Sequence, residues 1–380
     1  MTRRELHIGS TPRVAHITVV HKPSDARIHH RQCRTLATAG YEVHLLSGGV
    51  PNAWVDGIHL HPLSESKERP PLRRQVSRQL RALTSALRLR ADLYHLHDPH
   101  LIPLGLLLRM RGARVVYDVH DDSPQHARQK LRGRAIRGAA KAATWVVLQA
   151  AARRWLDAFV CASPALALRF PPQQTVVAGN FPLREEFAPE PPPSRANPPV
   201  ILYLGVARSD KGLETIVEAI RLVPVELNAK LRIAGEMRPP RKPEAIRALP
   251  WADRIEIVPH RPRACALEEL RRATVGLAVL PPLLNNREGW RSNKLFEYMA
   301  AGLPVVVSDA PGWREIIERY ECGLAVDAED PRAVATAISE LLRDPERARR
   351  MGARGREAVM SDLNWDRDAP RLLGLYERLL

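Results

Sequence analysis

The chain of 380 residues is long enough for two or three domains, and its content of 45% hydrophobic and 26% charged residues is that of a globular protein. Its net charge of +16 favours anionic partners, while its four widely spaced cysteines exclude a zinc ribbon or a paired redox motif and are expected as buried, reduced thiols. No run of about 18 apolar residues and no signal-peptide pattern occurs, so the sequence predicts a cytoplasmic protein without a membrane-spanning helix.

Short β-branched strands alternate with helical segments through the first half of the chain. Gly40 is predicted to end the helix that precedes the second strand. The predicted strands are 14–20, 41–47, 92–97, 114–120 and 158–163. Because strands separated by helices form a parallel sheet covered on both faces, residues 1–187 are predicted to form a doubly wound α/β domain.

The alternation pauses at 188–199, where proline and polar residues predict a linker. It then restarts, and the stretch 330–380 is predicted to be almost wholly helical. The predicted strands of this half are 200–205, 230–236, 254–258, 275–281, 303–309 and 323–327. The sequence therefore predicts a second doubly wound domain, and ligands of such sheets bind beyond the carboxyl ends of the strands.

The basic residues are concentrated in the first half, where residues 1–190 hold 28 Lys and Arg against 15 Asp and Glu. Two acid-free stretches, 69–91 and 123–156, predict helices with arginine on their outer faces. Such faces attract lipid headgroups, nucleic acid or a phosphorylated substrate, and a simply solvated arginine face is the alternative. Their apolar residues recur at helical spacing and are expected to face the core: Val76, Leu80, Leu83 and Leu87 in the first, Ile136, Ala140, Ala143 and Val147 in the second.

The segment 285–309, NNREGWRSNKLFEYMAAGLPVVVSD, is predicted to form a loop, a capped helix, a glycine turn and a strand. Glu297 lies one turn into the helix, where a carboxylate can bind vicinal hydroxyls such as those of a ribose. An ordinary cap with Glu297 facing solvent is the alternative. The N–H groups expected to face an anion at the helix start are those of Ser292, Asn293, Lys294 and Leu295.

The segment 202–219, LYLGVARSDKGLETIVEA, is predicted to form a strand ending at Gly205, a loop and a helix. The loop carries Arg208 and Lys211. Two cations there suit a diphosphate leaving group, whose negative charge grows as the glycosidic bond breaks. Arginine would bind the oxygens as a planar fork and lysine as a point charge, and a pair of solvated loop cations is the alternative.

Together these segments resemble family 4 of the retaining glycosyltransferases, or glycosyl transferases group 1, which have the GT-B fold. SDARIHHRQCRTLATAGYEVHLLSGG and DLYHLHDPHLIPLGLLLRMRGARVVYDVHDD resemble its first domain, and YLGVARSDKGLE, LRIAGE and KLFEYMAAGLPVVVSD its donor domain. The resemblance implies two Rossmann-like domains facing across a cleft. The acceptor-binding domain would span 1–187, the linker 188–199 and the nucleotide-sugar domain 200–362. A tail helix, 363–380, would cross back to the first domain.

The resemblance also implies roles for individual residues. Lys211 matches the family's donor-phosphate lysine, and Glu297 matches the second carboxylate of its glutamate pair, which holds the donor ribose. His120 matches a histidine beside the transferred sugar, although alone it is more typical of a hydrogen-bonded strand end. Asp25 and Arg27 are candidates for acceptor or sugar contacts, with a plain turn as the alternative.

Two positions depart from the family pattern. Val206 stands where members commonly have arginine, so the phosphate role of that arginine is assigned to Arg208 as a hypothesis. The position that matches the first glutamate of the pair is Gly289, and Glu288 is one residue out of register. Either the loop shifts to bring Glu288 in or that carboxylate is absent, which concerns the identity of the sugar more than the activity.

The resemblance implies a retaining hexosyltransferase (EC 2.4) that uses a nucleotide sugar, with UDP ahead of GDP. The acceptor would be a glycan or a lipid-linked hydroxyl in envelope or exopolysaccharide synthesis. No DxD-type motif lies on a suitable loop, so no cofactor and no metal are expected. The basic first domain predicts peripheral contact with the cytoplasmic face of an anionic membrane.

Three alternatives stay open at the level of sequence. A sugar-nucleotide epimerase shares the GT-B fold and would change the sugar without an acceptor. A nucleic-acid-binding protein would explain the basic half, but no zinc-finger spacing and no RRM-like aromatic motif occur, so no nucleic-acid partner is predicted. A catalytically inactive relative would bind the nucleotide without turnover.

Overall fold

The computed structural model describes residues 11–63, 71–120, 135–187, 197–238, 243–282 and 289–380. The chain divides into two compact units. Unit 1 comprises residues 1–179 and 368–380, and unit 2 comprises 180–367. Unit 2 begins earlier than the predicted domain boundary because Phe181 packs edge-on against Phe296 and Phe187 is buried in the unit 2 core. Most of the predicted linker lies outside the described residues.

Unit 1 contains an eight-stranded sheet in the order β3-β4-β2-β1-β5-β6-β7-β8. Its described strands pair in parallel except at β3, which runs antiparallel to β4. The strands are β1 (Arg13–Ile17), β2 (Glu42–Ser47), β3 (Ala53–Val55), β4 (Ile58–Pro62), β5 (Leu93–Leu96), β6 (Arg114–Val119), β7 (Ala158–Cys161) and β8 (Thr175–Val177). The predicted parallel sheet is confirmed, whereas β3, β4 and β8 were not predicted.

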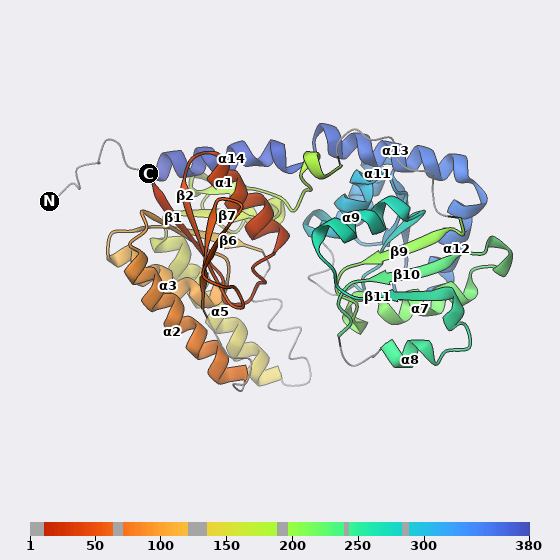
Figure 1. The fold of residues 1–380 in the computed structure, drawn as a ribbon, viewed down its shortest axis with the longest axis horizontal. Helices are drawn as coiled ribbons and strands as arrows, with labels where there is room; N and C mark the ends of the chain where they lie inside the picture. Colours follow the sequence, from red (N-terminus) through yellow and green to blue (C-terminus); the bar gives the residue numbers. More distant parts are fainter. Residues whose placement is uncertain (1–10, 64–70, 121–134, 188–196, 239–242, 283–288) are drawn as a thin grey trace. The chain divides into compact units, whose positions relative to one another are not determined.

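Helices cover both faces of this sheet. Figure 1 shows α2, α3 and α5 on one side and α1 and α14 on the other. Gly40 has a φ of 91° and follows the first helix, so the predicted stop is confirmed. The helices are the π-helix η1 (Ala26–Cys33), α1 (Arg34–Thr38), α2 (Pro71–Leu89), α3 (Ile102–Met110), α5 (Ala135–Trp155), α6 (Pro164–Ala167) and, from Asp368 on, α14 (Trp365–Leu379).

The predicted inward face of α5 is wrong, and that of α2 is only partly right, because Leu87 packs against the core whereas Leu80 does not. Leu80 is 59% exposed and Val147 is 66% exposed. The residues that face the sheet instead include Ala82 and Ala86 of α2 and Ala152 of α5, all fully buried. Small side chains let these helices approach the sheet closely, so the larger apolar residues are displaced from the contact.

Unit 2 contains a six-stranded parallel sheet in the order β11-β10-β9-β12-β13-β14, the order of a dinucleotide-binding fold. Its strands are β9 (Val200–Leu204), β10 (Lys230–Ala234), β11 (Ile255–Val258), β12 (Val275–Ala278), β13 (Val305–Ser308) and β14 (Gly323–Val326). Its helices are α7 (Leu213–Leu222), α8 (Pro243–Arg247), α9 (Arg263–Arg272), α10 (Asn293–Ala300), α11 (Pro311–Tyr320), α12 (Pro331–Arg343) and α13 (Pro345–Ser361).

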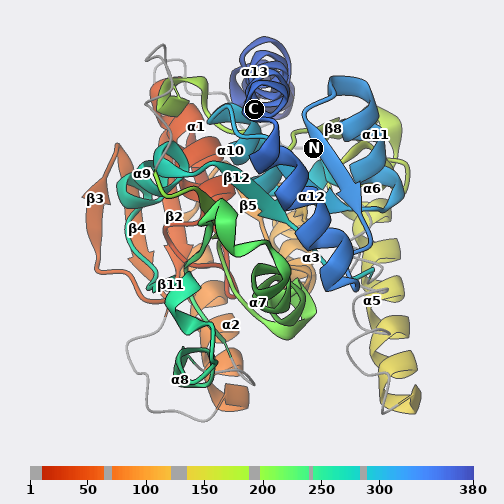
Figure 2. The same cartoon turned by 90° about the vertical axis from the view of Figure 1, so that its right-hand side faces the viewer.

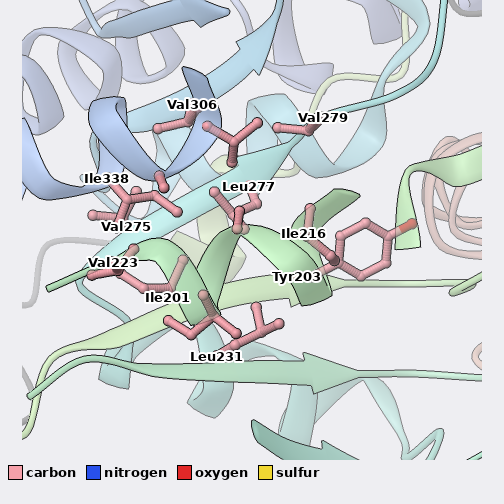
Figure 3. Close-up of a cluster of buried hydrophobic side chains, with 14 of the residues drawn as sticks. Ile201, Tyr203, Ile216, Val223, Leu231, Val275, Leu277, Val279, Val306 and Ile338 are labelled. Carbon is pink, nitrogen blue, oxygen red and sulfur yellow. The ribbon is translucent and has the colours of Figure 1, made fainter. Parts of the chain in front are cut away.

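Two apolar layers sandwich the unit 2 sheet. In one of them, shown in Figure 3, alternate residues of the strands pack against Ile216 of α7 and Ile338 of α12. Figure 2 also shows α7 and α12 next to each other. The opposite face, which includes Leu202, packs against α9, α10, α11 and α13. The unit is therefore doubly wound, as predicted. None of the described helices is both long and apolar enough to cross a bilayer.

Candidate functional site

The strand order of unit 2 reverses between β9 and β12, and ligands of such sheets bind beyond the strand ends at this point. The loop after β9 packs directly on the end of β12. A Cβ atom on Gly212, at the start of α7, would lie 2.3 Å from the carbonyl oxygen of Val279. Only glycine fits this close approach, which fixes the loop that carries Arg208 and Lys211.

Lys294 lies beside the end of β9. Its Nζ is 3.8 Å from the ring centroid of Tyr203, within the range of a cation–π contact. A Cβ on Gly205 would lie 3.9 Å from Lys294 Cε, so the side chain runs past the strand end. The Tyr203 hydroxyl lies 3.0 Å from the carbonyl oxygen of Val206 and 3.1 Å from that of Lys211, which ties the loop to the strand.

Two lysine charges act on each other at this strand end. Burial and the nearby charge of Lys211 lower the pKa of Lys294 to about 7, against the opposing effect of Glu297. A second ammonium group that lowers a lysine pKa marks a place where an anion is stabilised. The structure thus brings the Lys294 side chain within electrostatic reach of Lys211, a residue of the predicted donor-phosphate group.

The start of α10 is capped as predicted, but the cap uses part of the predicted anion site. The Ser292 hydroxyl accepts a hydrogen bond from the Leu295 N–H at 3.2 Å. The Ser292 N–H donates to the carbonyl oxygen of Gly289 at 3.0 Å. Two of the four amides expected to face an anion, those of Ser292 and Leu295, are therefore engaged within the chain.

Glu297 is buried, contrary to the alternative in which it faces solvent. The Arg263 guanidinium, at the start of α9, donates to Glu297 Oε1 at 2.6 Å. The same guanidinium binds both carboxylate oxygens of Glu186, at 3.0 and 2.8 Å. Burial opposes the charge of Arg263, but the two carboxylates outweigh it and raise its pKa above the ordinary value. Arg263 therefore holds the Glu297 carboxylate in a fixed position.

Arg208 forms an ion pair with Asp210 through two hydrogen bonds, one of them 2.7 Å long between Arg208 Nε and Asp210 Oδ1. This bond raises the pKa of Arg208 and lowers that of Asp210. The carboxylate thus compensates the charge that a diphosphate would bind. Glu288, the candidate out-of-register carboxylate, lies outside the described residues.

The strand order of unit 1 reverses between β1 and β5, and Asp98 lies at this point. Its Oδ2 accepts hydrogen bonds from the Thr18 hydroxyl at 2.9 Å and from the Val19 N–H at 2.6 Å. Its Oδ1 is 3.5 Å from His21 Nε2. The buried carboxylate therefore holds the loop after β1, where the predicted residue Asp25 lies.

His120 follows β6 within a group of imidazoles and carboxylates. Its Nε2 is 3.2 Å from Asp118 Oδ2, and its ring stacks on His21 at 4.8 Å. Burial opposes the negative charge of Asp118. The Arg27 guanidinium and the His120 imidazole outweigh this effect and hold the pKa of Asp118 well below its usual range. His120 is thus the partly exposed end of a buried hydrogen-bonded network.

The two other predicted residues of unit 1 have structural partners. Asp25 caps η1 by accepting from the N–H groups of Arg27 and Ile28, and His21 bonds to its carboxylate. Arg27 is 2% exposed and donates to Asp118 at 2.7 Å and to the Ala178 carbonyl oxygen at 2.6 Å. Arg27 therefore fixes Asp118, and Asp25 is the one of the two that remains partly exposed.

Sequence reasoning missed the partners that hold these groups. The motif YHLHD signals a strand with two histidines on one face and an acid at its end, which gives His97 and Asp98. YDVHD likewise pairs Asp118 with His120. Arg263 carries no such signal, because its carboxylate partners lie far away in the sequence.

Two family models match the chain. The model described as Glycosyl transferases group 1 matches residues 184–358, and that described as Glycosyltransferase Family 4 matches residues 26–170. The first lies within unit 2 and the second within unit 1. Both predicted groups of site residues, apart from Asp25, therefore fall inside matched regions.

The chain is 42% identical over 76 residues to the GDP-mannose-dependent alpha-(1-6)-phosphatidylinositol monomannoside mannosyltransferase of Mycobacterium tuberculosis, a match that covers 20% of either chain. The sucrose-phosphate synthase of Thermosynechococcus elongatus aligns with a TM-score of 0.77 at 22% identity, over 97% of this chain and 99% of that one. The Anabaena protein HepE in complex with UDP-glucose aligns with a TM-score of 0.70 at 13% identity, over 96% and 99%. At these identities the solved structures share the fold.

Proposed function

The chain belongs to the glycosyltransferases of group 1 and family 4, with the GT-B fold, and on that premise we propose that it transfers a hexose from a nucleotide sugar to an acceptor hydroxyl with retention of configuration. Unit 2 binds the donor in this proposal. Unit 1 supplies groups for the acceptor and the transferred sugar. The epimerase and nucleic-acid-binding alternatives find less support, because both family models describe glycosyltransferases.

The observation that carries the proposal is the pair of lysines beside the end of β9. Burial and the charge of Lys211 lower the pKa of Lys294, so a diphosphate there relieves the repulsion between the two ammonium groups. Glu297, held by Arg263 one turn into α10, would accept hydrogen bonds from ribose hydroxyls. Phosphate at the helix start and ribose one turn later is the order of groups in a nucleoside diphosphate.

On the unit 1 side, we assign His120 to contact with the transferred sugar and Asp25 to contact with the acceptor or the sugar. Arg27 then acts as a positioning residue, since it fixes the carboxylate that bonds to His120. The network orients the imidazole before substrate arrives, which reduces the cost of ordering it in the transition state.

The bond between the anomeric carbon and the diphosphate oxygen breaks, and the acceptor oxygen bonds to that carbon from the same face. The leaving diphosphate takes the acceptor proton. Lys211, Lys294 and Arg208 stabilise its growing negative charge, so catalysis consists of positioning and charge stabilisation rather than a covalent carboxylate intermediate. The proposal includes no cofactor and no metal at the donor site.

UDP is the first candidate for the nucleotide and GDP the second. The Anabaena protein was solved in complex with UDP-glucose, and the mycobacterial relative is GDP-mannose-dependent, so both bases occur among similar proteins. The residues that contact the base would decide between UDP and GDP, and direct binding measurements with the two nucleotides test this choice.

The enzyme is further proposed to act at the cytoplasmic face of an anionic membrane, on a lipid-linked or glycan acceptor. Exposed basic residues include Arg88 of α2 and Lys141 and Arg154 of α5. Helix α5 also exposes Val147 and the 56% exposed Trp155. Basic helices with exposed apolar residues bind anionic lipid surfaces. Cosedimentation with vesicles containing phosphatidylglycerol at low salt tests this, and failure to sediment removes this part of the proposal.

The decisive experiment is a thermal-shift titration with UDP, GDP and ADP, followed by transfer assays with the sugars of the nucleotide that binds. A ligand that binds only the folded state raises the melting temperature. One nucleotide should raise it in the native chain and fail to do so in Lys211→Ala and Glu297→Gln. A shift without any transferred sugar indicates an inactive relative, and release of an altered nucleotide sugar indicates an epimerase. No shift with any nucleotide overturns the proposal.

A further inference from the structure

Three histidines lie together on the edge of the unit 1 sheet. His44 is on β2, and His59 and His61 are on β4, the strand that pairs with it. The register pairs His44 with His59 and Leu46 with His61, so all three side chains project from one face of the sheet. One nitrogen from each ring lies within 4.8 Å of the others. We call this group the edge histidine cluster, and Figure 2 shows its strands β4 and β2 next to β3, the strand at the border of the sheet.

A carboxylate stands behind the edge histidine cluster. Glu42 Oε1 accepts a hydrogen bond from His44 Nε2 at 2.9 Å, and Arg13 Nε donates to the same oxygen at 2.9 Å. The bond to Glu42 fixes the proton of His44 on Nε2. Its Nδ1 therefore presents a lone pair, which accepts a hydrogen bond from His61 Nε2 at 2.8 Å. A carboxylate that orients an imidazole in this way is typical of metal-binding histidines.

The third ring is oriented by a separate contact. His59 Nε2 lies 3.0 Å from the side-chain oxygen of Asn52, which leaves Nδ1 on the side of the cluster. Burial and the neighbouring imidazoles lower the pKa of His61 to about 4, and burial lowers that of His44. Neutral imidazole is the form that binds metal, so His44 and His61 need not lose a charge-bearing proton at neutral pH.

We infer that the edge histidine cluster binds one divalent cation of the zinc type through His44 Nδ1, His59 Nδ1 and His61 Nε2, while Glu42 orients the His44 ring through its hydrogen bond to Nε2. Metal–nitrogen bonds of about 2.0–2.1 Å require ligand nitrogens roughly 3.3 Å apart. Small rotations of the rings reach this arrangement from the observed spacing. The bound ion ties the short β3–β4 pair to β2 and leaves one coordination position for water.

The two other groups of clustered ligands in unit 1 are less suited to a cation. His16, His95 and His97 are buried at 0–1% exposure, so an ion would have to pass through packed side chains to reach them. Asp118, next to His97 and His120, is paired with the Arg27 guanidinium. A cation there would be repelled by Arg27, whereas in the edge histidine cluster His59 and His61 are partly exposed.

The test is a titration of the metal-free, untagged full chain with Zn²⁺, followed by calorimetry and by the visible absorption of Co²⁺ in its place. One equivalent should bind with a tetrahedral Co²⁺ spectrum. His59→Gln and His61→Gln should each abolish this binding, and Glu42→Gln should weaken it by about 10-fold to 100-fold. His260→Gln, at an exposed histidine of unit 2, is the matched control and should leave it unchanged.

Amide exchange gives a second measurement that does not depend on stoichiometry. Zn²⁺ should slow exchange in residues 53–62 of the native chain and should have no effect there in His61→Gln. One equivalent bound equally well by His59→Gln and His61→Gln overturns the inference. The inference is also overturned if the native chain binds Zn²⁺ no more tightly than these two variants do.

Discussion

Each unit has an arginine–aspartate ion pair next to its strand ends, and this pair is buried in unit 1 but partly exposed in unit 2. Arg27 and Asp118 of unit 1 are 2% and 0% exposed, whereas the side chains of Arg208 and Asp210 in unit 2 are 36% and 39% exposed. The two sheets share their central strand order, so topology does not cause this difference. Unit 1 uses its charges to fix a network of side chains, and unit 2 leaves cations where a ligand can reach them.

Histidine content follows the same division. Residues 1–179 contain 13 of the 14 histidines, and unit 2 contains only His260. In unit 1 the rings form a buried chain from Asp118 through His97 and His16 to Tyr376 on α14, with hydrogen bonds of 3.1, 2.9 and 3.2 Å. The two units should therefore respond differently to pH and to substitution of a charge.

Acidification should have the largest effect and should act on unit 1. Burial lowers the pKa of His16, His95 and His97, so below about pH 6.5 the unfolded chain takes up protons that the folded chain does not. Stability then falls by up to about 1.4 kcal/mol per pH unit for each ring. His21 opposes this, because its pKa is raised and its contribution is lost as pH rises.

Hydrogen exchange at pH 7 and pH 5, corrected for the intrinsic rate, measures this separately for each unit. Protection should decrease in the strands of unit 1 and persist in those of unit 2. An equal loss of protection in both units would show that the buried histidines of unit 1 do not cause it. His260→Gln serves as the control and should leave the exchange protection of both units unchanged at either pH.

Substitution of a buried charge should have the next largest effect. Asp118→Asn leaves the Arg27 guanidinium buried without a counterion and should destabilise unit 1 by about 3–5 kcal/mol. The matched change in unit 2, Asp210→Asn, removes an exposed partner and should cost about 0–1 kcal/mol. Exchange protection of β6 and of β9 reports the two effects. Similar losses of protection would show that burial of the ion pair does not determine the cost of removing its carboxylate. The double variant Arg27→Met/Asp118→Leu should recover much of the stability.

Lys211→Ala should reduce function without reducing stability. Loss of one cation that stabilises the leaving group should lower kcat/KM on the order of 10²-fold. Lys230→Ala is the control, because Lys230 begins β10 at the opposite end of the sheet. The melting temperatures of both variants should match that of the native chain. Equal activity in the two variants would exclude Lys211 from the donor site.

The smallest expected effect concerns Lys294, whose pKa of about 7 makes donor binding depend on pH. A bound diphosphate favours the charged form and raises this pKa. Nucleotide affinity should therefore fall as pH rises above 7, by at most about tenfold per unit. Lys294→Met should bind more weakly at pH 7 and lose this slope. Calorimetry at pH 7 and 8 measures both, and an unchanged slope in the variant would assign the titration to another group.

Much of the fold could be predicted because long apolar strands separated by helices leave few arrangements. The predictions failed where the local signal was weak or ambiguous. β3 has only three residues, and β4 alternates histidine with apolar residues, so neither shows a clear run of apolar residues. On α5, Ala140, Ala143 and Val147 have the spacing of a buried face, yet the equally well-spaced Ala142 and Trp145 are the buried ones. Periodicity identifies a helix but does not select between two apolar stripes.

The sequence by itself determined two parallel-sheet domains and placed the lysine, the glutamate and the helix cap of the donor segments, since each depends on neighbours a few residues away. Only the tertiary structure decided what those groups contact. Arg263 meets Glu297 and Glu186, and Arg27 meets Asp118, across separations that no local pattern encodes. Whether a charged side chain binds a ligand or stabilises the fold depends on its burial and its partners. Both are set when distant segments pack together.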